Sequence, residues 1–552
     1  MAKPVRFTPE MFEHYRELGY WTGERISDFW DKNAAEYPDR EALSDARVRL
    51  TWGEAKKWID RMALGLLELG FKKDDMLVIQ LPNCVELVLL RLAAEKVSVL
   101  CAPVLRTFRH QEMEYILSRT EAVGVVIPGQ LRGFDHFQMI QDIKSNLPKL
   151  KHIISSCDEI PPGTISLRAM VEKDIEARYP PDFLKQTTCP PDEFSLVLTT
   201  SGSTGFPKFV EHPVCSRVFI GKVYAERWYI TGDDVFGMVG PAQAGPNIAA
   251  YLSLPQVGAR LAMLEHFEAE AALQLVEKEK VTVLAIVPAQ LALILRHPAF
   301  GKYDLSSLRI VACTGAPLAY KLAIEAEDKL GRPIVQYYGS VDAGGSMISS
   351  PDQPQEDRLL TAGRPKRGVE VKMVDDDGKE VPRGEVGEVW VRGATFVSGY
   401  FKDPEGTSQA WTDDGWFRMG DLARWDERGN LVIVGRKKDL IIRGGQNVYP
   451  VEIENMLITH PQVAAVAVVA MPDPVMGEKA CAFVVPKPGT DFTFEEMVSF
   501  LKEKSLAMFK IPERLELTDQ LPMVAAGQKV DKKALQQLIR DKLTAEEGCG
   551  GE

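Results

Sequence analysis

The sequence predicts an α/β protein: a large N-terminal domain of layered α/β subdomains plus a β-rich subdomain, followed by a small α+β C-terminal domain. Short apolar runs with β-branched residues, such as residues 76–81 and 124–127, alternate with longer helical patterns such as residues 52–69. This alternation favours helices packed on largely parallel sheets. The chain has 552 residues, 45% of them hydrophobic, and therefore has enough apolar material for more than one core.

The middle of the chain continues this pattern and then departs from it. Residues 281–287 and 308–313 are predicted strands on either side of a helix. At about residues 387–401 alternating apolar and polar residues between turns replace the helical periodicity. We therefore expect the β-rich subdomain to lie there.

A charged, hinge-like run at residues 435–439 marks a domain boundary. We divide the chain into residues 1–436 and residues 437–552, and the second part is long enough to fold alone. The last residues, 547–552, are expected to form an irregular tail. The elements expected in the second domain are a helix at 450–459, strands at 463–471 and 480–485, and a helix at 493–504.

Composition excludes several classes of function. The formal net charge of −12 argues against a surface that binds nucleic acid or anionic lipid, so an anionic substrate must be met by local donors. No stretch approaches 18 uninterrupted apolar residues, and the charged N-terminus is followed by no apolar segment, which indicates a soluble cytoplasmic protein with no membrane span. The eight cysteines include no C-x-x-C pair, so neither a zinc ribbon nor a disulfide framework is expected.

A loop rich in hydroxyl groups and glycine is the strongest chemical signal. Residues 198–208 read Leu-Thr-Thr-Ser-Gly-Ser-Thr-Gly-Phe-Pro-Lys and follow an apolar, strand-like stretch. Backbone N–H groups, hydroxyls and a lysine suit a polyphosphate, and glycine lets the backbone approach it closely. The alternatives are a flexible Ser/Gly turn or a Walker-type loop, and the second is disfavoured because no Gly-Lys-Ser/Thr sequence is present.

This loop resembles the phosphate signature of the adenylate-forming superfamily of acyl-CoA synthetases, aryl-AMP ligases and luciferases. The resemblance covers residues 10 to 540, and further segments match in the family's order. Within the superfamily the chain is similar to 2,3-dihydroxybenzoate-AMP ligases at residues 14–21, 102–105 and 476–479. The matching segments are Thr-Gly-Ala-Pro-Leu at 314–318, Gln-Tyr-Tyr-Gly-Ser-Val-Asp at 336–342, Gly-Arg-Pro at 363–365, Gly-Asp-Leu at 420–422, Gly-Arg-Lys-Lys-Asp at 435–439 and Gly-Gly-Gln-Asn-Val-Tyr-Pro at 444–450.

The resemblance implies an ATP-dependent carboxylate–CoA ligase, whose first domain is an adenylation domain that binds nucleotide and acid. Such an enzyme uses ATP, Mg2+ and coenzyme A and forms an acyl-AMP before the acyl-CoA thioester. Tyr338 would stack on adenine beside Gly315 and Ala316, while Asp421 would accept hydrogen bonds from the ribose hydroxyls. Arg436 would assist Asp421. The phosphates would meet Thr200, Ser201, Gly202, Ser203, Thr204 and Lys208.

The metal position departs from the family pattern. The family places Thr and Glu where this chain has Val341 and Asp342. Asp342 is therefore the expected ligand of Mg2+, and its shorter side chain suits an ion that keeps several water ligands.

The resemblance also assigns catalytic roles near the chain's end. Lys529 would neutralise the charge that develops between the acid and the α-phosphate, with Gln528 as a one-residue insertion; Thr200 and Asp342 complete the catalytic set. Lys532 and Lys533 keep an alternative open, in which lysines in this stretch are solvated helix charges. A mobile C-terminal domain would rotate about Lys438. It would then present Gly444 and Gly445 to a pantetheine arm.

The acid pocket is expected at Gln243, Ala244, Gly245, Ile248 and Tyr337. In the dihydroxybenzoate ligases Asn and Ser contact the ring hydroxyls at the positions of Ala244 and Ile248. Ala244 and Ile248 offer these ring hydroxyls no hydrogen-bond partner, and each unpaired hydroxyl of a substrate would cost roughly 1–3 kcal/mol. The sequence therefore predicts an acid with an unhydroxylated ring, aryl or alicyclic. Tyr337 would shorten the pocket, while Ala244 and Gly245 would widen it. A shifted alignment across this Gly/Ala-rich loop is the alternative.

Two other readings stay open. An aryl-AMP ligase would load a separate carrier protein instead of coenzyme A. A degenerate member would bind a nucleotide or an acyl-adenylate without catalysis, as the changes at Val341, Asp342 and Gln528 suggest. The sequence leaves the oligomeric state open, a homodimer included.

Overall fold

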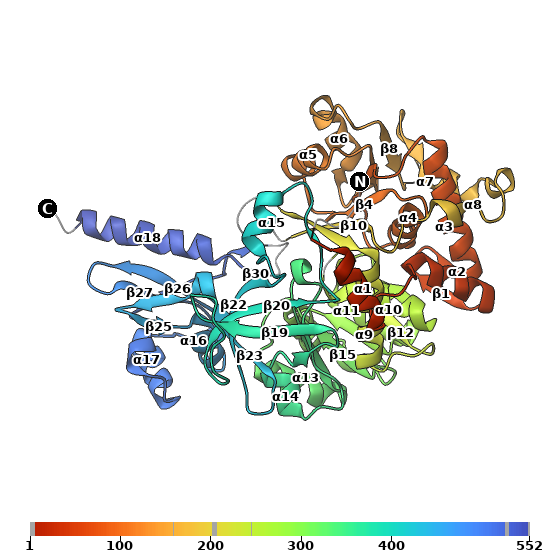
Figure 1. Ribbon diagram of the computed structural model, residues 1–552. Coiled ribbons are helices and arrows are strands. Elements are labelled where there is room, and N and C mark those ends of the chain that lie inside the picture. Colours follow the sequence, from red (N-terminus) through yellow and green to blue (C-terminus); the bar gives the residue numbers. More distant parts are fainter. Residues whose placement is uncertain (1–5, 158, 201–206, 244, 525–528, 550–552) are drawn as a thin grey trace.

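Two large sheets and a smaller antiparallel sheet form the N-terminal part of the molecule, and a separate sheet forms the C-terminal part (Figure 1). The structure is a computed structural model that describes residues 6–157, 159–200, 207–243, 245–524 and 529–549. Helices cover the two large sheets, so the predicted α/β class is confirmed.

The first large sheet has eight strands, and the apolar runs of the sequence form its parallel centre. An antiparallel hairpin of β10 and β11 lies toward one edge, and its two strands flank residues 200–208. In order across the sheet the strands are β21 (Gly399–Tyr400), β11 (Phe209–Pro213), β10 (Phe194–Thr199), β4 (Leu100–Pro103), β3 (Met76–Ile79), β5 (Gly124–Ile127), β8 (His152–Ser155) and β9 (Ile165–Ser166).

The second large sheet has nine strands, of which the five from β1 to β15 pair in parallel. β16 extends this parallel set, and the short strands β17 and β18 then pair antiparallel. Across the sheet the order is β18 (Arg364–Pro365), β17 (Met347–Ile348), β16 (Ile334–Tyr338), β15 (Ile310–Cys313), β14 (Val283–Ile286), β12 (Val235–Met238), β13 (Arg260–Met263), β1 (Glu41–Ser44) and β2 (Arg49–Thr51).

A layer of helices lies between these sheets and forms the main core with them. α4 (Val85–Lys96) packs on β4 and β10 of the first sheet, and α10 (Gly245–Val257) packs on β12 and β13 of the second. α9 (Val214–Arg227) joins the two layers, because it contacts α10 on one side and β10 and β11 on the other. Every residue of α4 is buried, including Arg91, Glu95 and Lys96.

Two further helices complete this layer. α3 (Trp52–Glu68) packs against α4 and α2 (Ile26–Glu36). It begins at Thr51, whose hydroxyl accepts from the backbone N–H of Glu54 while the Glu54 carboxylate accepts from the backbone N–H of Thr51. This capping box explains why the helix starts where the sequence pattern predicts it.

The β-rich subdomain is a four-stranded antiparallel sheet that starts earlier than the sequence analysis placed it. β19 (Val369–Val374) precedes β20 (Gly387–Gly393), and β22 (Phe417–Trp425) and β23 (Leu431–Arg436) follow. β19 reads Val-Glu-Val-Lys-Met-Val, in which Glu370 and Lys372 alternate with apolar residues as far as Met373. This alternation predicts a strand, which was missed by the sequence analysis.

The C-terminal part is an α+β unit whose predicted elements are present. Its sheet joins β24 (Ile441–Arg443), β25 (Gln446–Val448), β26 (Val463–Asp473), β27 (Gly477–Pro486) and β28 (Arg514–Leu517), and it is covered by α16 (Pro450–Leu457) and α17 (Phe494–Glu503).

The expected irregular tail is wrong for its first residues. α18 (Lys532–Cys549) continues as a helix and extends to the left in Figure 1. Its end is held because Arg514 Nη1 donates to Glu546 Oε2 at 2.8 Å. Across the described ranges, no helix combines the length and the apolar character that a membrane span requires.

A buried amine lies where β18 leaves the second large sheet. Lys366 is 3% exposed, its Nζ donates to the carbonyl oxygen of Gly344 at 3.1 Å, and it lies 4.6 Å from the ring centroid of Tyr224. Burial lowers the pKa of Lys366 from 10.5 to about 7. Between these pH values the unfolded chain holds a proton that the folded chain lacks, so the free energy of unfolding rises with pH across this window.

We predict that Lys366→Met raises the melting temperature above that of the native protein, because the free-energy cost of burying the amine is removed. The increase should be largest at or below pH 7. This gain should shrink as the pH rises toward about 10, where the unfolded lysine also becomes neutral. Thermal unfolding of both proteins at several pH values measures the difference, with exposed Lys222→Met as the control. A difference that is constant with pH would contradict the prediction.

Candidate active site

A buried carboxylate joins two sheets at the centre of the candidate site. Tyr338 Oη donates to Asp421 Oδ2 at 2.5 Å, and Arg436 Nε lies 2.8 Å from Asp421 Oδ1. Asp421 is 4% exposed. Burial raises the pKa of Tyr338, and the neighbouring Asp421 carboxylate raises it further, so the phenol stays a donor.

The strands position these three side chains. Asp421 and Arg436 are direct cross-strand partners of β22 and β23, while Tyr338 ends β16 in the second large sheet. The structure therefore brings together three predicted nucleotide-binding residues. An ionised carboxylate such as that of Asp421 acts only as an acceptor of hydrogen bonds.

The ends of the predicted phosphate loop are held together. The backbone N–H of Thr200 donates to the carbonyl oxygen of Lys208 at 3.0 Å, and the N–H of Lys208 donates to the Thr200 hydroxyl at 3.0 Å. These bonds extend the β10–β11 hairpin and hold the two ends of the phosphate loop together. We call this pair of residues, Thr200 and Lys208, the loop neck. The predicted phosphate contacts Ser201, Gly202, Ser203 and Thr204 lie outside the described residues.

Asp342 lies close to this neck, in the short helix Val341–Ala343. Its Oδ1 is buried and has no hydrogen-bond partner among the described residues. Burial raises the pKa of Asp342, against the lowering effect of a hydrogen bond with Tyr400 and of the Lys208 charge. Lys208 Nζ in turn lies 4.3 Å from the ring centroid of Tyr400.

This carboxylate fits a role as a magnesium ligand. A buried carboxylate oxygen with no donor is an unusual feature that a cation would satisfy. The described residues contain no group of three or more His, Cys, Asp or Glu side chains able to hold a metal ion. Mg2+ bound at Asp342 would therefore take its other ligands from phosphate and water, as this ion commonly does.

Tyr400 belongs to this group but was missed by the sequence analysis. It lies in β21, which pairs with β11 at Val210 and so comes next to the loop neck. No motif marks it, because its place depends on pairing between strands nearly two hundred residues apart in sequence.

The predicted adenine-side residues lie in the loop after β15. The hydroxyl of Thr314 donates to the carbonyl oxygen of Tyr337 at 2.6 Å and so holds this loop against β16. Gly315 has φ +88°, a conformation that glycine adopts without strain. Ala316 follows it and is half-buried.

The predicted acid pocket is only partly described. Gln243 Nε2 donates to the carbonyl oxygen of Val104 at 3.1 Å. Tyr337 is buried, its ring centroid lies 5.6 Å from that of Tyr224 and 5.5 Å from that of Trp228, and its hydroxyl has no described partner. Ala244 lies outside the described residues, while Gly245 and Ile248 are placed only by the backbone of α10.

The remaining predicted residues belong to the C-terminal part. Lys438 is exposed in the turn Lys437–Asp439 between β23 and β24. Gly444 and Gly445, with φ +54° and +81°, form the turn of the β24–β25 hairpin. A two-residue hairpin turn with positive φ at both positions is one that glycine adopts readily.

The catalytic lysine candidate lies in a two-stranded hairpin. Lys529 pairs with Val524 across β29 (Met523–Val524) and β30 (Lys529–Val530), while Gln528 and the side chain of Lys529 lie outside the description. Lys532 Nζ is bound to Glu454 Oε1 at 2.6 Å.

Comparison with known proteins identifies the family to which the chain belongs. The family model described as AMP-binding enzyme matches residues 30–401, and the AMP-binding enzyme C-terminal domain matches residues 452–528. The medium-chain fatty-acid–CoA ligase of Escherichia coli (strain K12) is 31% identical over 552 residues, which cover 99% of this chain and 95% of that protein. The 2,3-dihydroxybenzoate-AMP ligase of Bacillus subtilis (strain 168) is 31% identical over 547 residues and 98% of each chain.

A solved structure gives the same result for the fold. The crystal structure of ATP-bound MatB from Rhodopseudomonas palustris is similar with a TM-score of 0.83 and 26% identity, and the likeness covers 94% of this chain and 99% of that chain. The family model spans most of the chain, and both relatives match nearly its full length. The chain belongs to the AMP-binding enzyme family of adenylate-forming enzymes.

Proposed function

We propose that the protein is an AMP-forming carboxylate–CoA ligase that activates a cyclic carboxylic acid in the cytoplasm. The observation that carries the proposal is the buried group of Tyr338, Asp421 and Arg436, in which a paired carboxylate lies beside an aromatic ring. Such a group suits a ribose and its base. Family membership supports the same chemistry.

In the first step a carboxylate oxygen of the acid attacks the α-phosphorus of ATP, and the bond to pyrophosphate breaks. Asp421 would hold the ribose, and Thr200 and Lys208 would hold the phosphates at the loop neck. Lys529 would stabilise the charge that develops on the α-phosphate. Positioning and fixed charge supply most of the rate enhancement in this kind of transfer. Mg2+ bound at Asp342 would supply positive charge to the phosphate oxygens.

In the second step the thiol sulfur of coenzyme A attacks the acyl carbon, and AMP leaves with both electrons of the bond to the acyl carbon. Lys529 must then give way to the thiol, so the C-terminal domain, residues 437–552, would rotate about Lys438. The tight turn at Gly444 and Gly445 presents little but backbone, which suits the close passage of a pantetheine arm.

The substrate class rests on the acid pocket. The two relatives carry the same identity to this chain, yet one is named for a medium-chain fatty acid and the other for a dihydroxylated aromatic acid. Overall similarity therefore does not decide between them. Tyr337 packs edge-on against Tyr224 and Trp228, and an aromatic residue so held at the acid pocket would favour a compact ring, because ring edges and faces pack well together.

A second candidate function differs from the first in the thiol that accepts the acyl group. An aryl-AMP ligase would pass the acyl group to a separate carrier protein, and the relative from Bacillus subtilis is named for the adenylate alone. Pyrophosphate release and thioester formation, measured with and without coenzyme A over a panel of cyclic acids, test both candidates. Adenylate that forms but is not consumed by coenzyme A would favour the carrier protein; no pyrophosphate with any acid would overturn the proposal.

We predict that Lys529→Ala lowers pyrophosphate release by about 10²–10³-fold, because a charge aimed at the developing negative charge is lost. Formation of thioester from supplied acyl-AMP should change only a few-fold. The control is Lys532→Ala, which removes a lysine that is bound to Glu454. An equal loss of both half-reactions would contradict the two-conformation mechanism, and a larger effect of Lys532→Ala would move the catalytic role to that residue.

We predict that Asp421→Asn raises the KM for ATP at least about tenfold, since a charged acceptor of hydrogen bonds becomes a neutral amide. The ranking of acids by kcat/KM should stay the same, because Asp421 would contact the nucleotide alone. Steady-state kinetics with two acids measure both effects, and exposed Asp377→Asn is the matched control. A changed ranking would place Asp421 at the acid site instead.

We predict that benzoate or cyclohexanecarboxylate exceeds 2,3-dihydroxybenzoate in kcat/KM by at least about tenfold, because two hydroxyls would lack partners at roughly 1–3 kcal/mol each. The double variant Ala244→Asn, Ile248→Ser should narrow that ratio. Ratios within one variant are compared, because overpacking beside Tyr337 lowers all activities together. A preference of the native enzyme for the dihydroxylated acid would overturn the assignment of this pocket.

A further inference from the structure

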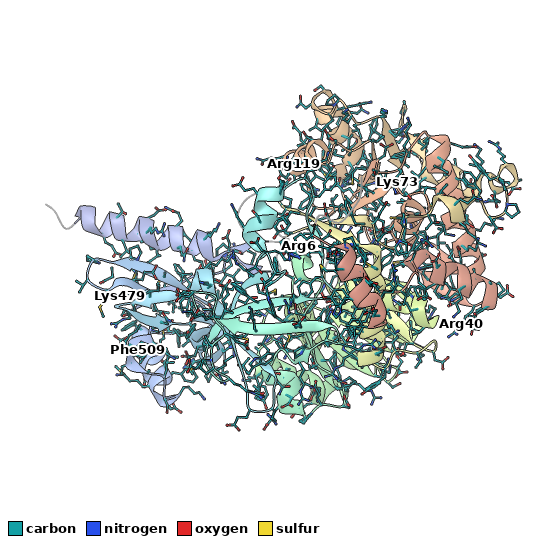
Figure 2. All side chains as sticks on the ribbon, viewed as in Figure 1. Arg6, Arg40, Lys73, Arg119, Lys479 and Phe509 are labelled. Atoms are coloured by element: carbon teal, nitrogen blue, oxygen red, sulfur yellow. The ribbon has the colours of Figure 1, made fainter. Side chains whose placement is uncertain are left out.

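Two arginines are buried in the helical layer between the large sheets. Arg91 of α4 is 3% exposed and Arg217 of α9 is 2% exposed. Most arginines of the chain, such as Arg40 and Arg119, instead lie at the outer surface (Figure 2). A buried guanidinium needs hydrogen-bond acceptors and a balancing charge, because moving it out of water is costly.

The hydrogen-bond donors of this pair are largely unused. Within the described part of the chain, Nε, Nη1 and Nη2 of Arg91 and Nε of Arg217 have no partner. Arg217 Nη1 donates to Ser195 Oγ at 3.0 Å and lies 3.4 Å from Glu95 Oε2. Buried donors without partners are rare in folded proteins, and four on two neighbouring side chains point to a bound acceptor.

Tyr251 and His212 complete the group, which we call the Arg91 cluster: Arg91, Arg217, Glu95, Tyr251 and His212. The guanidinium carbon of Arg91 lies 4.0 Å from the Tyr251 ring centroid and that of Arg217 lies 5.7 Å from it. The Tyr251 hydroxyl and His212 Nε2 are also buried, with no partner in the described ranges. The Tyr251 hydroxyl can donate a hydrogen bond, and His212 Nε2 can donate in the tautomer that carries the proton on this nitrogen.

The charges of the cluster do not balance. Two guanidinium groups face one carboxylate, Glu95, which already accepts from the backbone N–H of Ser27 at 2.9 Å. Burial and the two arginine charges lower the pKa of His212 to about 3, so the imidazole is neutral. The next cation of α4, Lys96, is balanced separately by Asp31 and Asp60 at 2.6 and 2.7 Å. One positive charge therefore remains.

Water alone does not resolve this imbalance. Buried water supplies hydrogen-bond acceptors, but it brings no charge. Arginine keeps its proton under all ordinary conditions, so the cluster cannot become neutral by losing one. A bound anion satisfies the unused donors and the charge together.

We propose that the Arg91 cluster binds a small monovalent inorganic anion of the chloride class, held by Arg91, Arg217 and the Tyr251 hydroxyl. A single negative charge matches the single excess positive charge. A small spherical anion also accepts from several donors with little demand on direction, whereas an organic acid would need space for its carbon skeleton.

The position of the cluster gives the anion a structural role in the candidate active site. Ser195 and His212 lie in β10 and β11, whose ends form the neck at Thr200 and Lys208. Tyr251 lies in α10, which begins at the predicted acid pocket. An anion bound among these elements would hold β10 and β11, which carry the loop neck, in a fixed position relative to α10, which carries part of the predicted acid pocket.

Thermal unfolding of the whole protein in sodium chloride and in sodium gluconate at equal ionic strength tests the proposal. We expect chloride to raise the melting temperature by roughly 2–5 °C, because only the folded chain holds the site. Arg91→Met should abolish this rise, since the variant leaves Arg217 and Glu95 as a balanced pair. The control is Arg168→Met, which removes an exposed arginine and should keep the full rise.

Crystals of the native protein grown in bromide give a second readout that does not depend on the variant folding. We expect an anomalous peak between the guanidinium groups of Arg91 and Arg217. Density for water alone at that place, or a melting temperature that is the same in both salts, would overturn the proposal. So would an equal chloride effect in the native protein and in Arg91→Met.

Discussion

The buried carboxylate of Asp421 is the interaction on which the candidate active site depends. It accepts from Tyr338, at the end of a strand in the second large sheet, and it is paired with Arg436, the last residue of β23. Because the Tyr338 hydrogen bond crosses to β16 while the Arg436 ion pair holds the carboxylate within the β-rich subdomain, the two contacts together fix this subdomain against the sheet that carries the aromatic ring. Breaking such a buried network by removing one partner is strongly destabilising. The turn Lys437–Asp439 begins directly after Arg436, so a rotation of the C-terminal part about Lys438 would start from a fixed point.

The parts of this site that could be predicted from the sequence are those whose contacts join residues close together in the chain. Asp421 and Arg436 stand in motifs, and the register of one hairpin brings them together. Thr200 and Lys208 likewise meet because the loop between them is short. Tyr400 could not be predicted, since it reaches Asp342 only through the pairing of β21 with β11. Lys366 was missed for the same kind of reason: nothing in a local pattern distinguishes a buried lysine from the solvated ones around it.

The fold shows the same division between local and distant signals. Parallel strands were predictable because burial on both faces leaves continuous apolar runs, and helices because of their periodicity and caps. The start of the β-rich subdomain was missed, although Glu370 and Lys372 alternate with apolar residues in β19 and indicate a strand there. The tail was misjudged because α18 continues to Cys549, with the contact of Arg514 with Glu546 close to its end. Its polar sequence gives little sign of that contact.

The charges of the molecule explain how an acidic protein meets an anionic substrate. A net charge of −12 repels a polyphosphate at long range, but this repulsion is screened within about 8–10 Å at physiological salt. Inside that range local groups decide, and the candidate site has Lys208 at the loop neck and Arg436 beside Asp421, the residue proposed to hold the ribose. Lys208 also lies over the ring of Tyr400, and within the described ranges no ion pair is formed between Lys208 and Asp342. The lysine charge that lowers the pKa of Asp342 can therefore also attract a phosphate at the loop neck.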